Sequence, residues 1–215
     1  MGVPVLVLGA SGSGKSTSLR NFDLDEVRVF NVAGKPFPFR KKLPVINNAT
    51  YADIKKNLEN QNAKTYVIDD SQYLMAFESF DHAKETGYGK FTNMALNFRN
   101  MIKFIVEYTP ADCIVYLLHH TELSEDGRTK AKTLGKMLDN QLTLEGLFSI
   151  VLMAQVEGEE HYFVTQSDGS NPCKSPMDMF EPRIDNDLKI VDTTIREYWG
   201  LNDISNKESE DNKNA

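Results

Sequence analysis

The sequence predicts an α/β protein, in which helices flank a mostly parallel sheet that has an antiparallel hairpin at one edge. Short apolar runs rich in β-branched residues alternate with segments of helical periodicity, as in buried parallel strands joined by helices. A glycine-rich turn directly follows the first apolar run. Two later apolar runs are separated by a short polar turn, which is typical of a hairpin.

The first half of the chain supplies strands and helices in alternation. Helix 50–60 is expected because Ile54 and Leu58 lie four residues apart, on one helical face. Three prolines within residues 33–44 exclude a central strand or helix there. The elements expected are strands at 3–8, 27–32 and 65–69, and helices at 15–21, at 50–60 and from 71 onward.

The second half continues the alternation and ends in the hairpin. A stripe of apolar residues predicts a helix over 91–108, before a buried strand at 113–118. The remaining elements expected are a polar basic excursion at 125–136, a short helix at 134–142, hairpin strands at 148–156 and 161–165, a loop at 168–186 and a helix at 188–199. We expect one domain over 1–201 and a disordered polar tail over 202–215.

Composition excludes several classes of protein. The 215 residues are 40% hydrophobic and 26% charged, which is ordinary for a soluble domain. The net charge of -7 disfavours bulk attraction to nucleic acid or membranes, although a local basic site remains compatible with it. No run approaches the ~18 apolar residues of a membrane helix, and the chain start lacks signal-peptide features. We therefore expect a cytoplasmic protein without membrane association.

The turn after the first strand carries a complete phosphate-binding motif. Residues 9–16, GASGSGKS, match G-x-x-x-x-G-K-[ST], in which glycines let backbone N–H groups converge on a polyanion. The lysine reaches the terminal phosphates and the serine hydroxyl ligates Mg²⁺. A plain surface turn is disfavoured because a strand precedes the motif and a helix is expected after it. The predicted nucleotide-binding residues are Gly9, Ala10, Ser11, Gly12, Ser13, Gly14, Lys15, Ser16 and Thr17.

A pair of acids follows the strand at 65–69. Since ligands of open α/β sheets bind at the carboxyl ends of the strands, these acids are expected beside the phosphate turn. Neighbouring strand residues point to opposite faces, so we assign Asp69 to the metal, together with Ser16, and Asp70 to the attacking water. The alternative is that Asp70 or Ser71 simply caps the next helix.

Two histidines end the strand at 113–118. His119 or His120 would lie where a polar side chain can sense the terminal phosphate, and only one can point inward from a regular strand. The alternative is a histidine satisfied by the backbone. Zinc is disfavoured because no third and fourth ligands cluster nearby.

Several segments together resemble a known family. Residues 67–74 (VIDDSQYL), 117–123 (LLHHTEL) and the region LEGLFSIVL…HYFVTQ…CKSPMDMF are similar to phage-encoded nucleotide-binding proteins related to the RecA recombinase core. The resemblance covers roughly residues 2–200. It implies a RecA-like P-loop NTPase fold, with Mg²⁺ and ATP bound and ATP hydrolysed. It also implies a role in single-strand annealing or DNA recombination in an infected bacterial host.

The resemblance further implies partners and their sites. The excursion would be a mobile loop that binds single-stranded DNA through Arg128, Lys130, Lys132 and Lys136. Lys174 would reach across the interface of a homo-oligomer to a neighbour's γ-phosphate, and a cognate single-strand-binding protein is an implied partner. We expect no polymerisation arm before the first strand. The form of assembly therefore stays open between a ring, assembly only on DNA, and a filament.

Other functions remain open on the residues alone. Residues 35–42 interleave basic and phenylalanine side chains, which suits single-stranded DNA or equally a solvated loop with buried rings. A small-molecule kinase would use the same phosphate turn. A non-catalytic nucleotide-sensing adaptor is kept open because Asp70 is shorter than a catalytic glutamate. A GTP switch is disfavoured because no N-K-x-D segment occurs.

Overall fold

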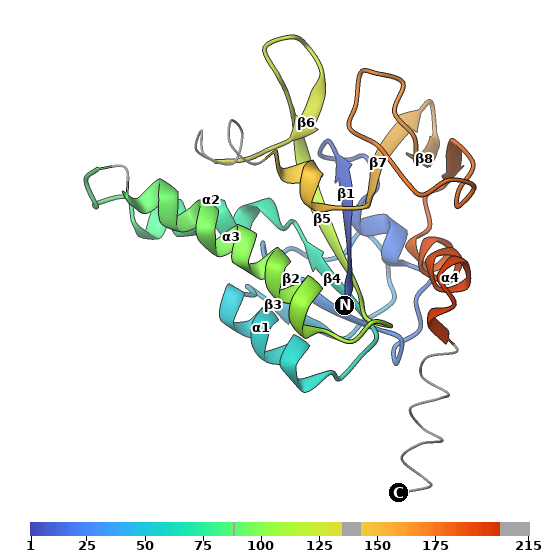
Figure 1. The fold of residues 1–215 in the computed structure, drawn as a ribbon, viewed down its shortest axis with the longest axis horizontal. Helices are drawn as coiled ribbons and strands as arrows, with labels where there is room; N and C mark the ends of the chain where they lie inside the picture. Colours follow the sequence, from blue (N-terminus) through green and yellow to red (C-terminus); the bar gives the residue numbers. More distant parts are fainter. Residues whose placement is uncertain (88, 135–142, 203–215) are drawn as a thin grey trace, which may run out of the picture.

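The computed structural model describes residues 1–87, 89–134 and 143–202, and it has an α/β fold with one mixed sheet flanked by helices (Figure 1). The strands are β1 (Val3–Gly9), β2 (Val27–Asn31), β3 (Val45–Asn47), β4 (Thr65–Asp69), β5 (Ile114–Leu123), β6 (Thr129–Ala131), β7 (Ile150–Glu157), β8 (Glu160–Val164) and β9 (Arg183–Asp185). The helices are α1 (Tyr51–Asn60), α2 (Gln72–Asp81), α3 (Gly89–Tyr108) and α4 (Leu188–Tyr198), with the 3₁₀ helices η1 (Ser16–Leu19) and η3 (Leu144–Leu147).

The sheet has the strand order β3-β2-β4-β5-β1-β7-β8-β9, and β6 pairs with the extended end of β5. The strands from β3 to β7 in this order are parallel, whereas β8 and β9 are antiparallel. The mostly parallel sheet and the hairpin of β7 and β8 are therefore confirmed. Since parallel strands share a direction, β1, β4 and β5 end at the same edge of the sheet.

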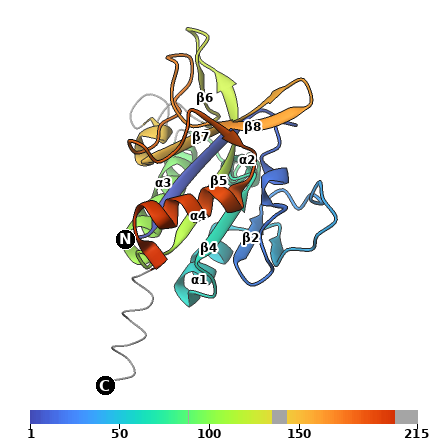
Figure 2. The same ribbon diagram turned by 90° about the vertical axis from the view of Figure 1, so that its right-hand side faces the viewer.

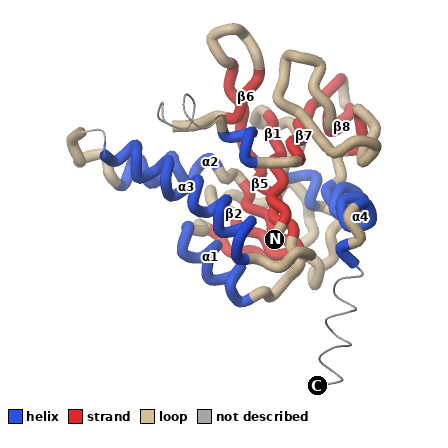
Figure 3. Tube along the Cα trace, viewed as in Figure 1, coloured by secondary structure: helices blue, strands red, loops and turns tan. Residues whose placement is uncertain are grey.

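The helices bury both faces of the sheet. Leu6 and Leu8 of β1 pack into a core cluster with residues of α1, α2 and α3. Val5 and Val7 point the other way, into a cluster with residues of η1 and α4. Figure 2 shows α4 lying across this second face, and Figure 3 shows the helices outside the strands. Burial on both faces explains why β1 is apolar throughout instead of alternating.

The element after the phosphate turn differs from the prediction. The helix expected at 15–21 is wrong, because the structure has only the four-residue 3₁₀ helix η1. The Ser18 hydroxyl donates to the Lys15 carbonyl at 2.5 Å, and so competes with the backbone for an acceptor in the first turn. Leu19 and Phe22 are then fully buried beneath the sheet, which fixes the chain before a second turn forms.

Three short strands were not predicted: β6, which lies within the polar excursion expected at 125–136, and the strands β3 and β9. β3 and β9 have three residues each, too few to show a period in the sequence, and β9 lies within the loop expected at 168–186. The predicted helix at 134–142 falls on residues outside the described part from 135 onward, as does the predicted tail from 203 onward. Among the described residues, none of the helices combines the length and hydropathy needed to cross a bilayer.

Candidate functional site

The edge where the parallel strands end brings the predicted residues together. The phosphate turn leaves β1 after Gly9, and the pairing of β1 with β5 sets Gly9 beside His120. On the other side of β5, Asp69 ends β4 and Asp70 follows it. Segments that lie more than fifty residues apart in the chain thus share one edge.

The glycines of the turn are required by its backbone. Gly12 and Gly14 have φ values of 80° and 93°, which side chains of L-residues rarely allow. A Cβ on Gly9 would lie 2.4 Å from the Ser13 hydroxyl. Among the described residues, no acceptor pairs with the N–H groups of Gly14, Lys15 and Ser16, so these donors are available to an anion. The dipole of η1 adds little, because one 3₁₀ turn sums few peptides.

Lys15 folds back over the turn that carries it. Its Nζ donates to the carbonyls of Gly9 at 2.7 Å and Ala10 at 2.9 Å. Burial lowers the pKa of Lys15 to about 8, although the nearby charges of Asp70 and Asp69 oppose the shift. The ammonium is thus poorly hydrated, which strengthens its attraction to a phosphate.

Ser16 and Asp69 form the predicted metal pair. The Ser16 hydroxyl lies 2.8 Å and 3.0 Å from the two carboxylate oxygens of Asp69. Burial, and then the charge of Asp70, raises the pKa of Asp69 to about 6, although the Ser16 hydrogen bond and the charges of Lys15 and Lys35 oppose the shift. Within the described ranges, no group of three or more His, Cys, Asp or Glu side chains converges. The pair fits Mg²⁺, whose other ligands would be phosphate and water oxygens.

Asp70 is held differently from Asp69. Its φ of 59° is in the left-handed region, a strained conformation for a residue with a side chain. Lys35 Nζ lies 2.6 Å from Oδ2, and His120 Nε2 lies 3.1 Å from Oδ1. Burial alone would raise the pKa of Asp70, but hydrogen bonds from His120 and Lys35 hold it at about 2.

The helix-cap alternative for this segment agrees with the structure in position, because Ser71 is the N-cap residue of α2. Ser71 precedes α2, yet its side chain makes no capping hydrogen bond. The Ser71 hydroxyl lies instead 3.1 Å from the Leu118 carbonyl and 2.8 Å from His119 Nδ1.

The two histidines point in different directions. His119 is fully buried, and its Nε2 lies 2.8 Å from the Lys132 carbonyl, which can only accept. Burial lowers the pKa of His119 to about 4, so Nε2 carries the proton and Nδ1 accepts from Ser71. His120 faces Asp70 and lies edge-on to Tyr73. Of the two predicted sensors, only His120 is therefore directed at the acids.

The predicted DNA-binding side chains lie on the hairpin of β5 and β6, which projects beyond the sheet at the top of Figure 1. Arg128 lies 3.2 Å from Asp126, and Lys130 lies 3.1 Å from Glu122. Lys132 is exposed, while its backbone bonds to both histidines. Lys136 lies outside the described residues. Acidic neighbours thus balance much of the cationic charge expected on this loop.

Lys174 is fixed through its backbone. Its N–H and carbonyl pair with Val151 of β7 at 2.9 Å and 2.8 Å, in an antiparallel bridge. The residue therefore adds a short edge contact to the sheet, and its predicted action on a neighbouring subunit stays a prediction.

Three further residues reach the site and were not predicted there. Lys35 was noted only as part of a basic segment, although Lys35 contacts Asp70. His161 Nδ1 lies 3.2 Å from the Ser13 carbonyl, beneath the turn. Asn186 is buried next to Gly14, and neither polar atom of its side chain has a partner within the described residues. Only the tertiary structure brings His161 and Asn186 to the turn, so no sequence signal was available for them.

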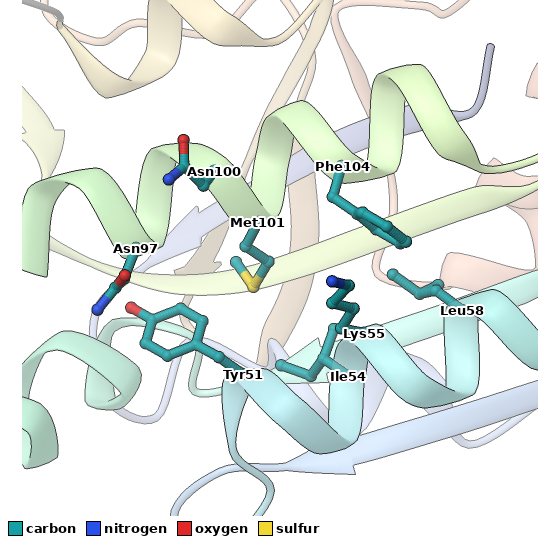
Figure 4. Close-up of a pocket in the computed structure, with 8 residues that line it drawn as sticks. All are labelled: Tyr51, Ile54, Lys55, Leu58, Asn97, Asn100, Met101 and Phe104. Carbon is teal, nitrogen blue, oxygen red and sulfur yellow. The ribbon is translucent and has the colours of Figure 1, made fainter.

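Two cavities differ in their suitability for a phosphate. One of about 560 Å³ lies over the turn and is lined by Gly9–Ser13, Thr121, Thr129 and residues 153–156. Another of about 360 Å³ lies between α1 and α3, where Figure 4 shows Ile54, Leu58, Met101 and Phe104 forming its apolar wall. The second contains none of the residues of the phosphate turn, and its one cation, Lys55, lies over the Phe104 ring. The first adjoins the predicted phosphate turn, although Lys15, Ser16 and the two acids do not line it.

Neither protein-family models nor curated protein sequences give a match to this chain. What the chain does must consequently be inferred from the geometry at the edge of the sheet.

Proposed function

We propose that this chain is a P-loop NTPase with a RecA-like fold that binds ATP with Mg²⁺ and hydrolyses it. The observation that carries the proposal is the meeting of the Ser16 hydroxyl and the Asp69 carboxylate at 2.8 Å, beside a glycine turn with free N–H groups. A hydroxyl and a buried acid from a nearby parallel strand, here β4 with β5 between it and β1, are the protein ligands that Mg²⁺ needs in this class of site.

Each residue then has a role in the proposed reaction. The N–H groups of the turn bind the phosphates, and Lys15 neutralises charge on the terminal ones. Mg²⁺ held by Ser16 and Asp69 would supply further neutralisation of the phosphate oxygens. Asp70, oriented by His120, accepts a hydrogen bond from the attacking water and aligns it with the terminal phosphate.

For the biological setting, we propose ATP-dependent annealing or exchange of single-stranded DNA in phage recombination. The resemblance to phage-encoded RecA-like proteins supports this setting. In addition, His120 belongs to β5, the strand that continues into the projecting hairpin. A ligand that binds the hairpin could therefore shift His120 through the strand. On binding DNA, Arg128 and Lys130 would leave their acidic partners, Asp126 and Glu122, and bind DNA phosphates instead.

A nucleotide-sensing adaptor without turnover is the second candidate. The specific observation in its favour is that Lys35 and His120 engage both carboxylate oxygens of Asp70, so a water would have to share an oxygen with one of them in this conformation.

Binding and turnover measured separately distinguish these candidates. We expect Mg²⁺-dependent ATP binding by calorimetry, phosphate release, and loss of both in Lys15→Ala, because no other buried cation occupies the described turn. Lys64→Ala is the control, since Lys64 pairs with Asp112 away from the turn. Tight binding with no phosphate release, with or without single-stranded DNA, would support the adaptor. Normal turnover in Lys15→Ala would overturn the ATPase proposal.

A further inference from the structure

Lys35 belongs to the loop after β2, and its backbone is fixed at the edge of the sheet. The Asn31 side chain at the end of β2 donates to the Lys35 carbonyl at 2.7 Å. Asn31 is buried and pairs in register with Asp69 of β4. Gly34 makes the turn with a φ of 66°, and a Cβ there would lie 2.3 Å from Asn48 Oδ1. The side chain of Lys35 therefore starts beside the acids and not from a freely moving loop.

The ammonium of Lys35 is held at the site by its ion pair with Asp70, and this ion pair can be broken. Its Nζ lies 2.6 Å from Asp70 Oδ2 and 5.5 Å from the centre of the Tyr73 ring, while 60% of the side chain is exposed. Only the ammonium of this pair is exposed, since the Asp70 side chain is 7% exposed; water can solvate the separated ammonium, and His120 stays with the buried carboxylate. The long flexible stem of lysine lets the charge move by several ångströms while the backbone stays fixed.

Both oxygens of the partner carboxylate already have a nitrogen partner in this arrangement. His120 Nε2 approaches Oδ1 of Asp70, and Lys35 covers Oδ2. Each oxygen keeps a second lone pair, but a water bound to Oδ2 would share that oxygen with the Lys35 ammonium until Lys35 leaves. A terminal phosphate bound at the neighbouring turn carries more negative charge than one carboxylate and offers three acceptor oxygens. It is therefore the stronger partner for the ammonium.

We propose that Lys35 exchanges Asp70 for the terminal phosphate when a nucleoside triphosphate binds, and is thereby a further catalytic residue of the site. The exchange places a second cation, besides Lys15, on the phosphate that is transferred. It also leaves Oδ2 of Asp70 free for the attacking water, while His120 keeps Oδ1. The inference rests on the proposed function, and it makes Lys35 the residue that distinguishes a triphosphate from a diphosphate.

The test compares two nucleotides with Mg²⁺: ADP and an ATP analogue with an imido bridge between the β- and γ-phosphates. We expect Lys35→Met to weaken calorimetric binding of the analogue by about 10- to 100-fold, with ADP affinity changed by less than about threefold. Lys41→Met is the matched control, because Lys41 lies on the same loop but pairs with Asp23 on the surface. An unchanged preference for the analogue in Lys35→Met would overturn the inference.

A second measurement uses the unaltered protein, and so does not depend on how the variant folds. Amine-reactive labelling of Lys35, followed by mass spectrometry, should decrease with the analogue and not with ADP, relative to Lys41. Equal labelling of Lys35 with both nucleotides would contradict the exchange. If the unaltered protein binds neither nucleotide, the proposed function itself fails; if it binds both and only the Lys35 results are negative, this inference alone fails.

Discussion

At the scale of single residues, two neighbouring acids have opposite environments. Asp69 is buried with only a neutral hydroxyl donor, and burial raises its pKa to about 6. Asp70 has an ammonium and an imidazole as partners, which lower its pKa to about 2 despite partial burial. The charged form of Asp69 therefore destabilises the folded protein.

We expect Asp69→Asn to stabilise the protein in the absence of Mg²⁺. The pKa of Asp69 is about 6 in the folded protein and about 4 in the unfolded chain. Above about pH 6 the carboxylate is charged in both states, and its charge destabilises the fold by the full amount. Below about pH 4 it is protonated in both states, and the destabilisation is gone. The free energy of unfolding at pH 7.5 should therefore rise by about 1–3 kcal/mol, and the gain should disappear near pH 4. Urea titrations at both pH values measure this.

The same variant tests the metal role. The melting temperature of the original protein should rise when Mg²⁺ and ATP are added together, whereas that of Asp69→Asn should rise far less. A full Mg²⁺-dependent shift in the variant would remove Asp69 from the metal site.

At the scale of elements, the hairpin of β5 and β6 links the site to a projecting surface. Lys132 shows the connection, because its N–H donates to the His120 carbonyl at 2.9 Å and its carbonyl lies 2.8 Å from His119 Nε2. A ligand that moves this hairpin would consequently move the histidines that end the buried part of β5.

We expect the triple change Arg128→Ala, Lys130→Ala and Lys132→Ala to weaken binding of single-stranded DNA while ATP affinity is retained. Losing up to three phosphate contacts should lower the affinity roughly 10- to 100-fold at low salt and reduce the salt dependence by about two units of the log–log slope. Fluorescence anisotropy over a salt series gives both quantities.

A charge-matched variant controls for the change in net charge. Lys55, Lys56 and Lys103 are exposed on α1 and α3, so alanine at these three positions should alter DNA affinity little. DNA binding that is equal in the two triple variants would reject the hairpin as the binding site.

At the scale of the whole molecule, one buried network joins α4 to the start of the sheet. Arg196 donates to Asp192 at 2.7 Å, to the Asp112 carbonyl at 2.8 Å and to the Thr65 hydroxyl at 2.9 Å. Asp192 in turn accepts from Thr65 and Tyr116. The network ties a helix to the beginnings of β4 and β5, at the end of these strands opposite to Asp69 and His120.

We expect Arg196→Met to destabilise the fold by about 3–5 kcal/mol, because it leaves Asp192 buried without its cation. The double change with Asp192→Leu should recover much of the loss, since a buried pair can be replaced by apolar side chains. Chemical denaturation measures both variants. Arg183→Met serves as the control, because Arg183 pairs only with exposed acids among the described residues. A loss in the double variant as large as in Arg196→Met would contradict this account.

The sequence by itself determined the parallel core strands, the hairpin and the glycine turn with Lys15 and Ser16. These features depend on local periodicity and on backbone angles that only certain residues adopt, so they are visible within a few neighbouring residues. The carboxyl-edge rule was also sufficient to place Asp69 beside Ser16, although 53 residues separate them.

The tertiary structure alone decided the rest of the site. Lys35 meets Asp70 because Asn31, which pairs with Asp69, holds the Lys35 carbonyl at the end of β2. His119 turns away from the acids because its strand alternates against α3. The helix after Lys15 is only a short 3₁₀ helix, because Leu19 at its end and Phe22 just after it are buried in the core. Such contacts join segments that are distant in the chain, and their geometry is fixed by packing, which no local pattern of residues encodes.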